Sequence, residues 1–547
     1  MRPEPRRGDL PSPLPGRGPG GGGLPPRHRI TVIIPVADRP RQLANILASL
    51  LELCRTFPYG DDDGGRQHHV AVLVADDSAD AAAIRRHREI AQEVEAQGLP
   101  VLYFGATEQA ALLRALPAAQ RQALQHVVGE PETTGFRHKG AAVTRNLASL
   151  LAWQMSGAAD DRLFMFVDSD EQFKVRIAAS PQDRDVFAIN YFDCLDRIFA
   201  SGDVDVLTGK VVGDPPVSPA VMTGNFLADV IGLLEAMASV DPSSPCAFHA
   251  ASAQVGDAAY HDMADLFGFV PATDPFSYRC TLIGDHNHAL CLADFAAKLD
   301  HFFDGEHPTR SSTYLPGAAG IDLQPARTVY TGNYVCNRAG LVHFIPFAPL
   351  KLRMAGPVLG RLIRAAIGPR FVSANLPLLH TRTVHGDAEF RPGVSRAAAN
   401  VDLAGEFERQ FFGDVMLFTV ERLVGMGYPA HTPGIETIRQ ILDATAGELQ
   451  EKYSAKRALI LTRLDLAITC FNASQRWWNL AADSRKTRAN FQRFFANIRH
   501  NFGMDSNCHH LIADPVHRAD RLTEMAQALA CGSGDTAAWR AALASLQ

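Results

Sequence analysis

Short apolar runs alternate with amphipathic stretches along roughly the first 170 residues. The runs "RITVIIPV", "HVAVLVAD" and "LFMFV" end in polar turn residues, as strands buried on both faces do. Between them, "RQLANILASLLELC", residues 80 to 97 and the stretch after Gly140 carry apolar side chains at helical spacing. Strands that alternate with helices predict an α/β fold, in which a parallel or mixed sheet is covered by helices on both faces. Ligands are expected at the carboxyl ends of its strands.

The pattern changes after about residue 400, where long amphipathic stretches replace the strand pattern. They predict an α-helical C-terminal domain over 396–547, and a homodimer through these helices is one expectation. Residues 1–28 are rich in Pro, Gly and Arg and are expected to be a disordered tail. Because the chain has 547 residues, more than one hydrophobic core is expected. The α/β domain is assigned to 29–395, with an insertion at about 214–330.

The composition is that of a globular protein, with 46% hydrophobic and 20% charged residues. A net charge of -6 offers no basic surface for nucleic acid. No uninterrupted apolar run approaches the ~20 residues that cross a bilayer, so no transmembrane segment is expected. Nine cysteines without a CxxC pair predict neither a disulfide framework nor a zinc ribbon, and they favour a cytoplasmic protein.

Paired acidic residues follow two of the buried runs. Asp76 and Asp77 end the second run, while Asp168 and Asp170, with Glu171 directly behind them, end a later one. Carboxylates at strand ends either cap a turn or helix or hold a ligand, and a hard divalent cation is a ligand that such a pair suits.

Two cationic residues lie between the acidic pairs, near the start of the helix expected after Gly140. Backbone N–H groups, the helix dipole and the side chains of Lys139 and Arg145 can together hold a phosphate there. A solvated helix start with a surface Lys and Arg is the alternative.

Four segments, "VIIPVADR", "VADDS", "KGAAVTRN" and "FVDSD", come in the order and approximate spacing of the GT-A glycosyltransferases, whose mark is a DxD motif. This resemblance to family 2-like enzymes implies a GT-A fold and a metal-dependent hexosyltransferase that moves a sugar from a nucleotide diphosphate donor, of UDP or GDP type, to an acceptor hydroxyl. The implied donor-binding residues are Pro35, Asp76, Asp77, Lys139, Arg145 and Asp168. The implied ligands of a Mg²⁺ or Mn²⁺ ion are Asp168 and Asp170.

Further along, "IDLQPARTVYTGNYVCNRAGLVHFIPFAP" and "FVSANLPLLHTRTVHG" resemble, in layout, the glucosyl-3-phosphoglycerate synthases, which are retaining GT-A enzymes. The resemblance implies that Gly332 and Asn333 lie in the acceptor region. It implies that His380 is a third metal ligand, with His385 as the alternative, and that Arg382 lies near a phosphate.

The chain departs from inverting relatives at "KLRMAGPVLGRLIRAAIG", where an acidic general base would be expected and none is present. A retaining mechanism, or a base supplied by Asp387 or Glu389, is therefore expected. Within this basic stretch Arg353 is the candidate to meet an anion, and Arg353 and Asp170 are the expected catalytic residues. Two rival functions are a phosphohydrolase with Asp168 as nucleophile and a catalytically silent binding module.

The insertion at 214–330 contains His261-Asp262, Asp285, His286, His288 and His307, but no pair has a regular metal-ligand spacing. We expect this insertion to shape the acceptor pocket rather than to bind a second metal. The aromatic pair Trp477-Trp478 is expected to be buried, with stacking on a sugar as the alternative.

Overall fold

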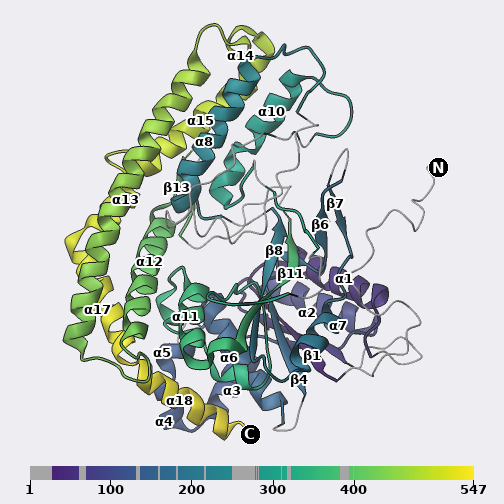
Figure 1. The fold of residues 1–547 in the computed structure, drawn as a ribbon, viewed down its shortest axis with the longest axis vertical. Helices are drawn as coiled ribbons and strands as arrows, with labels where there is room; N and C mark the ends of the chain where they lie inside the picture. The colour runs from purple at the N-terminus through teal and green to yellow at the C-terminus, as the bar shows by residue number, and fades with distance from the viewer. Residues whose placement is uncertain are drawn as a thin grey trace.

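The structure is a computed structural model that describes residues 27–60, 69–130, 136–157, 161–179, 183–214, 217–248, 278, 280, 282–308, 311–316, 322–381, 393–397 and 400–547. In Figure 1 a sheet with its covering helices forms the lower part of the molecule, and long helices form the upper part. Four residues singled out in the sequence, Arg382, His385, Asp387 and Glu389, lie outside the described residues, as do His261 and Asp262.

A nine-stranded mixed sheet is the centre of the α/β part, which confirms the predicted α/β class. Its order is β3-β2-β1-β4-β10-β8-β11-β5, with β9 paired to β11. Strands β1 to β4 run parallel, whereas β10 runs antiparallel to both of its neighbours. The bounds are β1 (Arg29–Val36), β2 (Val70–Asp76), β3 (Val101–Phe104), β4 (Arg162–Val167), β5 (Glu171–Gln172), β8 (Val206–Gly213), β9 (Leu323–Pro325), β10 (Asn333–Cys336) and β11 (Phe371–His380).

Helices cover both faces of the sheet because its strands are apolar on both sides. Every residue of β4 after Arg162 is buried. One face packs against α1 (Pro40–Thr56), α2 (Ala81–Glu95) and α7 (Tyr191–Phe199). The other face packs against α3 (Ala106–Ala115), α5 (Gln125–Val128), α6 (Ala141–Met155), α11 (Ala355–Ile367) and the last helix, α18 (Gly532–Ser545). The short helix α4 (Ala118–Ala123) contacts α18.

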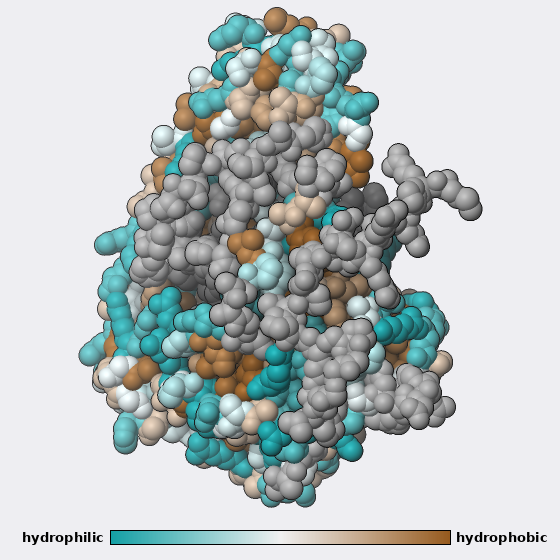
Figure 2. Space-filling model, turned by 45° about the vertical axis from the view of Figure 1, so that its right-hand side comes forward, coloured by the Kyte–Doolittle hydropathy of each residue, from teal (hydrophilic) through white to brown (hydrophobic). Residues whose placement is uncertain are grey.

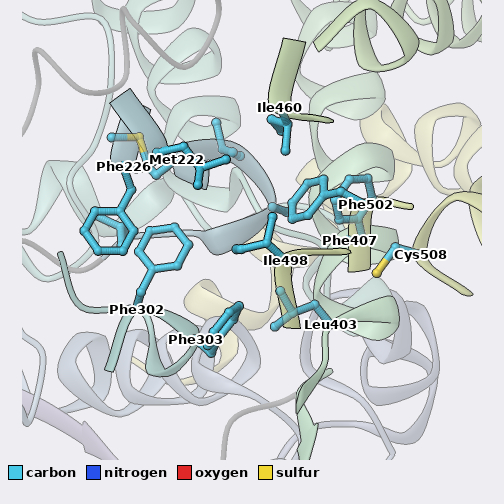
Figure 3. Packing of buried hydrophobic residues seen from close by; sticks show 14 of the residues in the cluster. Met222, Phe226, Phe302, Phe303, Leu403, Phe407, Ile460, Ile498, Phe502 and Cys508 are labelled. Atoms are coloured by element: carbon cyan, nitrogen blue, oxygen red, sulfur yellow. The ribbon is translucent and has the colours of Figure 1, made fainter. Parts of the chain in front are cut away.

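A second, helical core joins parts of the chain that are far apart in sequence. It contains α8 (Pro219–Ala238), α10 (His288–Lys298), α12 (Ala404–Gly425), α13 (Ile435–Asn472), α15 (Arg485–Phe502), α16 (Asn507–Ala513) and α17 (Pro515–Ala530). Figure 3 shows Phe226 of α8 beside Phe302, and the two rings stack with centroids 4.5 Å apart. Phe226 also meets Phe494 of α15 edge to face at 5.4 Å. Helices α8 and α10 of the insertion therefore pack with the C-terminal helices, while the domain boundaries drawn from the sequence stay a prediction.

Trp477 and Trp478 belong to the short α14 (Trp477–Leu480) within this helical part. Trp478 is fully buried, and its indole N–H donates to the carbonyl oxygen of Phe471 at 3.0 Å. The expectation of buried aromatics is thus met for Trp478. The remaining strands form two small hairpins, β6 (Val175–Ile177) with β7 (Arg184–Val186) and β12 (Ser395–Ala397) with β13 (Asn400–Asp402).

Among the described residues, α8 is long and apolar enough to cross a membrane by length and composition, although Asp229 and Glu235 interrupt its apolar sequence. In the folded chain, 72% of its most apolar window is buried. Core helices of soluble proteins have the same property.

Hydrophobic and hydrophilic residues are mixed on the face that Figure 2 shows. Large exposed hydrophobic residues are spread over several elements, among them Leu102 on β3, Leu466 on α13 and Val516 on α17. Scattered apolar residues are normal on a protein surface and do not define an interface. The homodimer expected through the C-terminal helices stays a prediction.

Candidate functional site

A cavity of about 800 Å³ lies where the α/β part meets helices α8, α11 and α12. Its floor is formed by the carboxyl ends of β1 and β4, and its walls come from the start of α6, the start of α8, residues 345–358 and one side of α12. A cavity of this size matches the range of small-molecule and cofactor sites. Its cationic lining residues are Arg39, Arg145, Lys351, Arg353 and Arg409, and its acidic ones are Asp77, Asp168, Asp170 and Glu406.

The position of the cavity follows from the sheet order. Strand β1 connects to β2 on one side, but the chain later returns to place β4 on its other side. The carboxyl ends of β1 and β4 therefore lie side by side in the sheet, and the cavity opens beside them. The sequence predicted ligands at strand ends, and the described cavity does adjoin Pro35 and Asp168, two of the residues selected there.

The acidic residues after β4 gather at the floor of the cavity. Asp168 forms an ion pair with Arg145 of α6, and Asp170 accepts a hydrogen bond from Arg39 at 3.0 Å. The His380 imidazole lies 3.9 Å from the same Asp170 oxygen. Three elements, β4, α6 and β11, thus bring a DxD pair, an arginine and a histidine together.

The next carboxyl group, Glu171, is more deeply buried than the DxD pair. Its Oε1 atom accepts a hydrogen bond from the Tyr330 hydroxyl at 2.6 Å, while its Oε2 atom has no hydrogen-bond partner in the described structure. Burial, together with the nearby negative charge of Asp168, raises the pKa of Glu171 well above its ordinary value. Asp170 behaves differently: burial opposes its charge, but His380 and Arg39 outweigh that effect and lower its pKa.

Gly332 packs directly against this acidic cluster. Its carbonyl oxygen accepts a hydrogen bond from the backbone amide of Asp168 at 3.1 Å. A Cβ atom on Gly332 would lie 2.7 Å from Glu171 Oε1 and 2.9 Å from Asp168 Oδ2. Only glycine fits here with the carboxylates in place. The family resemblance implied an acceptor role for Gly332, and the structure places it directly against the carboxylates of Asp168 and Glu171.

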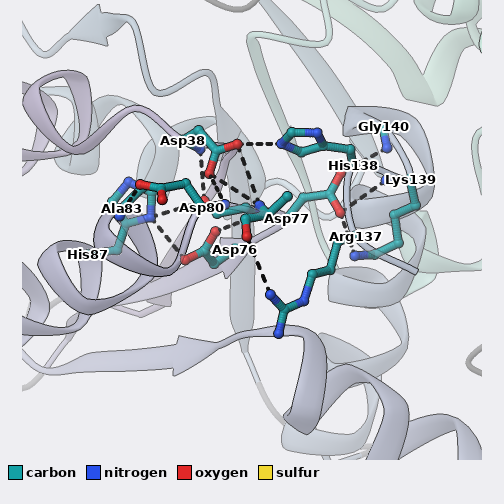
Figure 4. Close-up of polar contacts among 12 residues, drawn as sticks. Asp38, Asp76, Asp77, Asp80, Ala83, His87, Arg137, His138, Lys139 and Gly140 are labelled. Atoms are coloured by element: carbon teal, nitrogen blue, oxygen red, sulfur yellow. Dashed lines mark hydrogen bonds and ion pairs between the residues drawn. The ribbon is translucent and has the colours of Figure 1, made fainter. Parts of the chain in front are cut away.

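Asp77 organises the start of α6, as Figure 4 shows. It accepts hydrogen bonds from the backbone amides of Lys139 at 3.1 Å and Gly140 at 2.8 Å, and from the Lys139 amino group at 2.6 Å. The amino group of Lys139 therefore points at Asp77, whereas Arg145 lines the cavity. Burial lowers the pKa of Lys139, although Asp77 favours its charged form.

Asp76 points away from the cavity, toward α2. Its Oδ1 atom accepts a hydrogen bond from the Ser78 amide at 2.8 Å. Its Oδ2 atom accepts one from the Tyr103 hydroxyl at 2.5 Å and lies 2.9 Å from His87 Nδ1. Burial disfavours the charge on Asp76, but these hydrogen bonds outweigh it and lower the pKa. The sequence left open whether Asp76 and Asp77 cap α2. The cap is instead Asp80, whose carboxylate accepts a hydrogen bond from the amide of Ala83 at 2.8 Å.

Arg353 reaches the cavity from the segment before α11 and pairs with Glu406 of α12. Glu406 also accepts a hydrogen bond from the Ser218 hydroxyl at 2.9 Å. The backbone of Arg353 is fixed as well, since its amide donates to the Arg409 carbonyl at 3.1 Å. The expected anion-binding arginine thus lines the cavity, held by residues of the helical part.

Two other expected residues have mainly backbone partners. Asn333 is buried and donates both amide hydrogens, to the carbonyl oxygens of Lys210 at 2.9 Å and Leu376 at 2.8 Å. It therefore joins β8 to β11 and is absent from the described cavity lining. His380 is hydrogen-bonded through Nδ1 to the carbonyl oxygen of Asp214, which leaves Nε2 facing Asp170.

The backbone around the cavity is strained. Five non-glycine residues in the described structure have positive φ, and four of them line the cavity: His138, Phe347, Lys351 and Met354. The fifth, Asp38, forms an ion pair with His138. Each such conformation costs about 1–3 kcal/mol and persists only where the surroundings enforce it. This concentration of strain is typical of a functional site.

Sequence reasoning missed several residues of this cavity. Arg39 could have been suspected, because it follows β1 within the segment "VADRP". Glu406 and Arg409 carried no sequence indication, since they belong to a helix assigned to another domain.

Comparisons with known proteins add one finding. No family model matches this chain. No curated protein matches it either. Solved structures that match include a mannosyltransferase, PcManGT from Pyrobaculum calidifontis in complex with GDP-Man and Mn²⁺, with a TM-score of 0.32 and 9% sequence identity over 89% of this chain and 91% of that chain.

Proposed function

We propose that this chain is a metal-dependent glycosyltransferase that takes a sugar from a nucleotide diphosphate donor. The observation that carries the proposal is the convergence of a carboxylate pair, Asp168 and Asp170, with Arg39 and Arg145 at the floor of one large cavity. A diphosphate needs positive charge at its leaving oxygens, and a crevice at the carboxyl ends of parallel strands is a common place for nucleotides.

The residues at the floor fit a hard divalent cation. Asp168 and Asp170 would supply carboxylate oxygens at the floor. Glu171 lies buried behind them, outside the cavity lining, and its unpartnered Oε2 indicates a polar requirement that the described protein groups do not meet. His380 would add a nitrogen ligand, which the hard Mg²⁺ accepts less readily than Mn²⁺ does. When bound, the cation would neutralise the charge that develops on the departing diphosphate.

Arg145 and Arg39 are the proposed phosphate contacts of this chain. Both now neutralise the DxD carboxylates. Arg145 lies near the start of α6 and Arg39 is the N-cap residue of α1, so the dipole of a helix N-terminus adds to the effect of each. On the β1 side of the cavity, Pro35 and Asp77 are proposed to line the nucleoside pocket. On the opposite side, Arg353 is proposed to meet the acceptor or an outer phosphate.

We propose a retaining mechanism. Beyond Asp77, Asp168 and Asp170, the carboxylate of the described lining is Glu406, and it is held by Arg353 and Ser218 rather than free to accept a proton. An oxygen of the departing diphosphate would then accept the proton of the acceptor hydroxyl. A cytoplasmic location remains part of the proposal.

The test is calorimetric titration of UDP and GDP into the full chain, with and without Mn²⁺. Metal-dependent binding of one nucleotide should be lost in Asp170→Ala and retained in Asp465→Ala, whose carboxylate lies exposed on α13. Donor turnover monitored by NMR then reports the anomeric configuration of the product. Absence of nucleotide binding under every metal condition would refute the proposal, and phosphatase activity that requires Asp168 without any nucleotide would replace it.

A further inference from the structure

Three cysteines and one histidine gather in the helical part, away from the cavity. Ligand atoms of Cys246, Cys280, His286 and Cys291 all lie within 4.8 Å of one another. None of the four lines the cavity described above. In sequence they read Cys-x33-Cys-x5-His-x4-Cys, which is not a regular ligand spacing, and for that reason the sequence argued against a metal site in this stretch.

The fold brings these residues together through backbone contacts. The amide of Cys246 donates to the His286 carbonyl at 2.9 Å, and the amide of Cys280 donates to the Phe248 carbonyl at 3.1 Å. An isolated bridge between Pro245 and Asn287 continues this pairing. Cys291 lies in the first turn of α10, a helix that packs on α15. Three chain segments thus converge with their sulfur or nitrogen atoms pointing inward.

The dimensions suit a tetrahedral metal centre. Zn–S bonds of about 2.3 Å and Zn–N bonds of about 2.1 Å separate the ligand atoms of a tetrahedral site by roughly 3.5–3.8 Å. Here Cys280 Sγ and His286 Nε2 are 3.2 Å apart, and the widest separation in the set does not exceed 4.8 Å. Small side-chain movements would therefore bring all four ligands onto one ion.

Neighbouring groups support metal ligation. The Nδ1 atom of His286 bonds the Gly284 carbonyl oxygen at 2.8 Å, so Nε2, which faces Cys280 Sγ, is the nitrogen that would bind a metal. The sulfur of Cys246 accepts a hydrogen bond from the backbone amide of Phe248, and that of Cys280 accepts one from the amide of Leu282. The Tyr278 hydroxyl lies 3.7 Å from Cys291 Sγ, close enough to donate to a thiolate.

We propose that Cys246, Cys280, His286 and Cys291 bind a structural Zn²⁺ ion. Three thiolates and one imidazole are soft to intermediate ligands, which select zinc over the hard cations proposed for the DxD site. Four protein ligands fill a tetrahedral site and leave no position for a substrate, so the role is structural.

The ion ties together both ends of a long stretch of chain. Residues 247–279 separate Cys246 from Cys280 in sequence, and Cys291 connects the centre to α10 and the helical core. Zinc would thereby hold the insertion against the C-terminal helices, independently of nucleotide binding at the cavity.

The experiment measures zinc in the full chain purified under reducing conditions, without added metal. We expect about one zinc per chain by mass spectrometry of the metal. Cobalt exchanged into the protein should give visible d–d bands and near-ultraviolet thiolate-to-cobalt charge transfer, which an oxygen-liganded site does not produce. The double variant Cys280→Ser/Cys291→Ser and the single variant His286→Asn should each lose most of the zinc.

The matched control is Cys470→Ser, which changes a half-buried thiol outside the cluster and should keep its zinc. The cobalt spectrum of the unmodified chain needs no variant, so misfolding of a cysteine variant leaves the test intact. A zinc-free protein that shows no charge-transfer band with cobalt would overturn the proposal. Bound iron, or a disulfide between Cys280 and Cys291 in the reduced preparation, would overturn it as well.

Discussion

Gly332→Ala tests whether the carboxylates of Asp168 and Glu171 belong to the proposed metal site. The added methyl group would lie 2.7 Å from Glu171 Oε1, 2.9 Å from Asp168 Oδ2 and 3.1 Å from Tyr330 Cζ. Real Cβ atoms essentially never approach other heavy atoms within 3.0 Å, so both carboxylates must move by a few tenths of an ångström. Overpacking of this kind costs about 1–3 kcal/mol.

We expect most of this cost to appear in ligand binding, because the displaced groups are the proposed metal ligands. A change of that size corresponds to roughly 10- to 100-fold weaker Mn²⁺-dependent nucleotide binding. Calorimetry with the nucleotide that the unmodified protein binds, together with the melting temperature, separates a loss of affinity from a loss of folding.

The matched control is Gly447→Ala in α13, where a Cβ atom would meet nothing within 4 Å. This change should leave binding unaltered and stabilise the protein by about 0.5–1 kcal/mol, since alanine is the better helix former. Gly332→Ala with unaltered metal-dependent binding would contradict the assignment of Asp168 and Glu171 to the metal site.

Three further outcomes follow from the contacts described. Burial raises the pKa of Asp414 to about 7, against 3.8 for an ordinary aspartate. The protonated side chain therefore stabilises the folded state fully below pH 3.8, and this contribution to the unfolding free energy is lost as the pH rises through 7. Relative to Asp414→Asn, the unmodified protein should therefore lose about 2–3 kcal/mol of unfolding free energy between pH 5 and pH 8, and equal pH profiles in urea titrations would contradict this. Asp80→Ala removes the cap of α2 and should lower the unfolding free energy, whereas Asp80→Asn should largely preserve it; equal melting temperatures of the two variants would contradict this. Arg39→Gln removes the cation that contacts Asp170, so Mn²⁺ alone should bind more tightly while the nucleotide binds more weakly; a calorimetric decrease in Mn²⁺ affinity would refute this role.

Sequence patterns located the elements on which the site is built. The runs "RITVIIPV" and "LFMFV" became β1 and β4, because continuous apolar runs of this length are stable when buried on both faces. The residues selected at their ends follow from this register, and Asp168, Asp170 and Arg145 do meet at the cavity floor. GT-A topology, donor and acceptor identity and stereochemistry stay predictions.

Local patterns did not separate neighbouring residues that have different partners. Asp76 and Asp77 are adjacent at the end of β2, yet Asp76 points toward α2 and Asp77 toward α6, since successive side chains along an extended chain alternate in direction. Lys139 was expected near the phosphates, but its amino group contacts Asp77.

The sequence by itself determined the class of fold, the order of strands and helices over roughly the first 170 residues and the chemistry available at the ends of two strands, because these depend on local periodicity and residue type. Tertiary structure alone decided the long-range pairs: Arg353 with Glu406, the insertion helix α8 with α13, and the four ligands around Cys280. Those contacts arise from the packing of apolar surfaces that lie far apart in sequence, and neither spacing nor composition records which surfaces will meet.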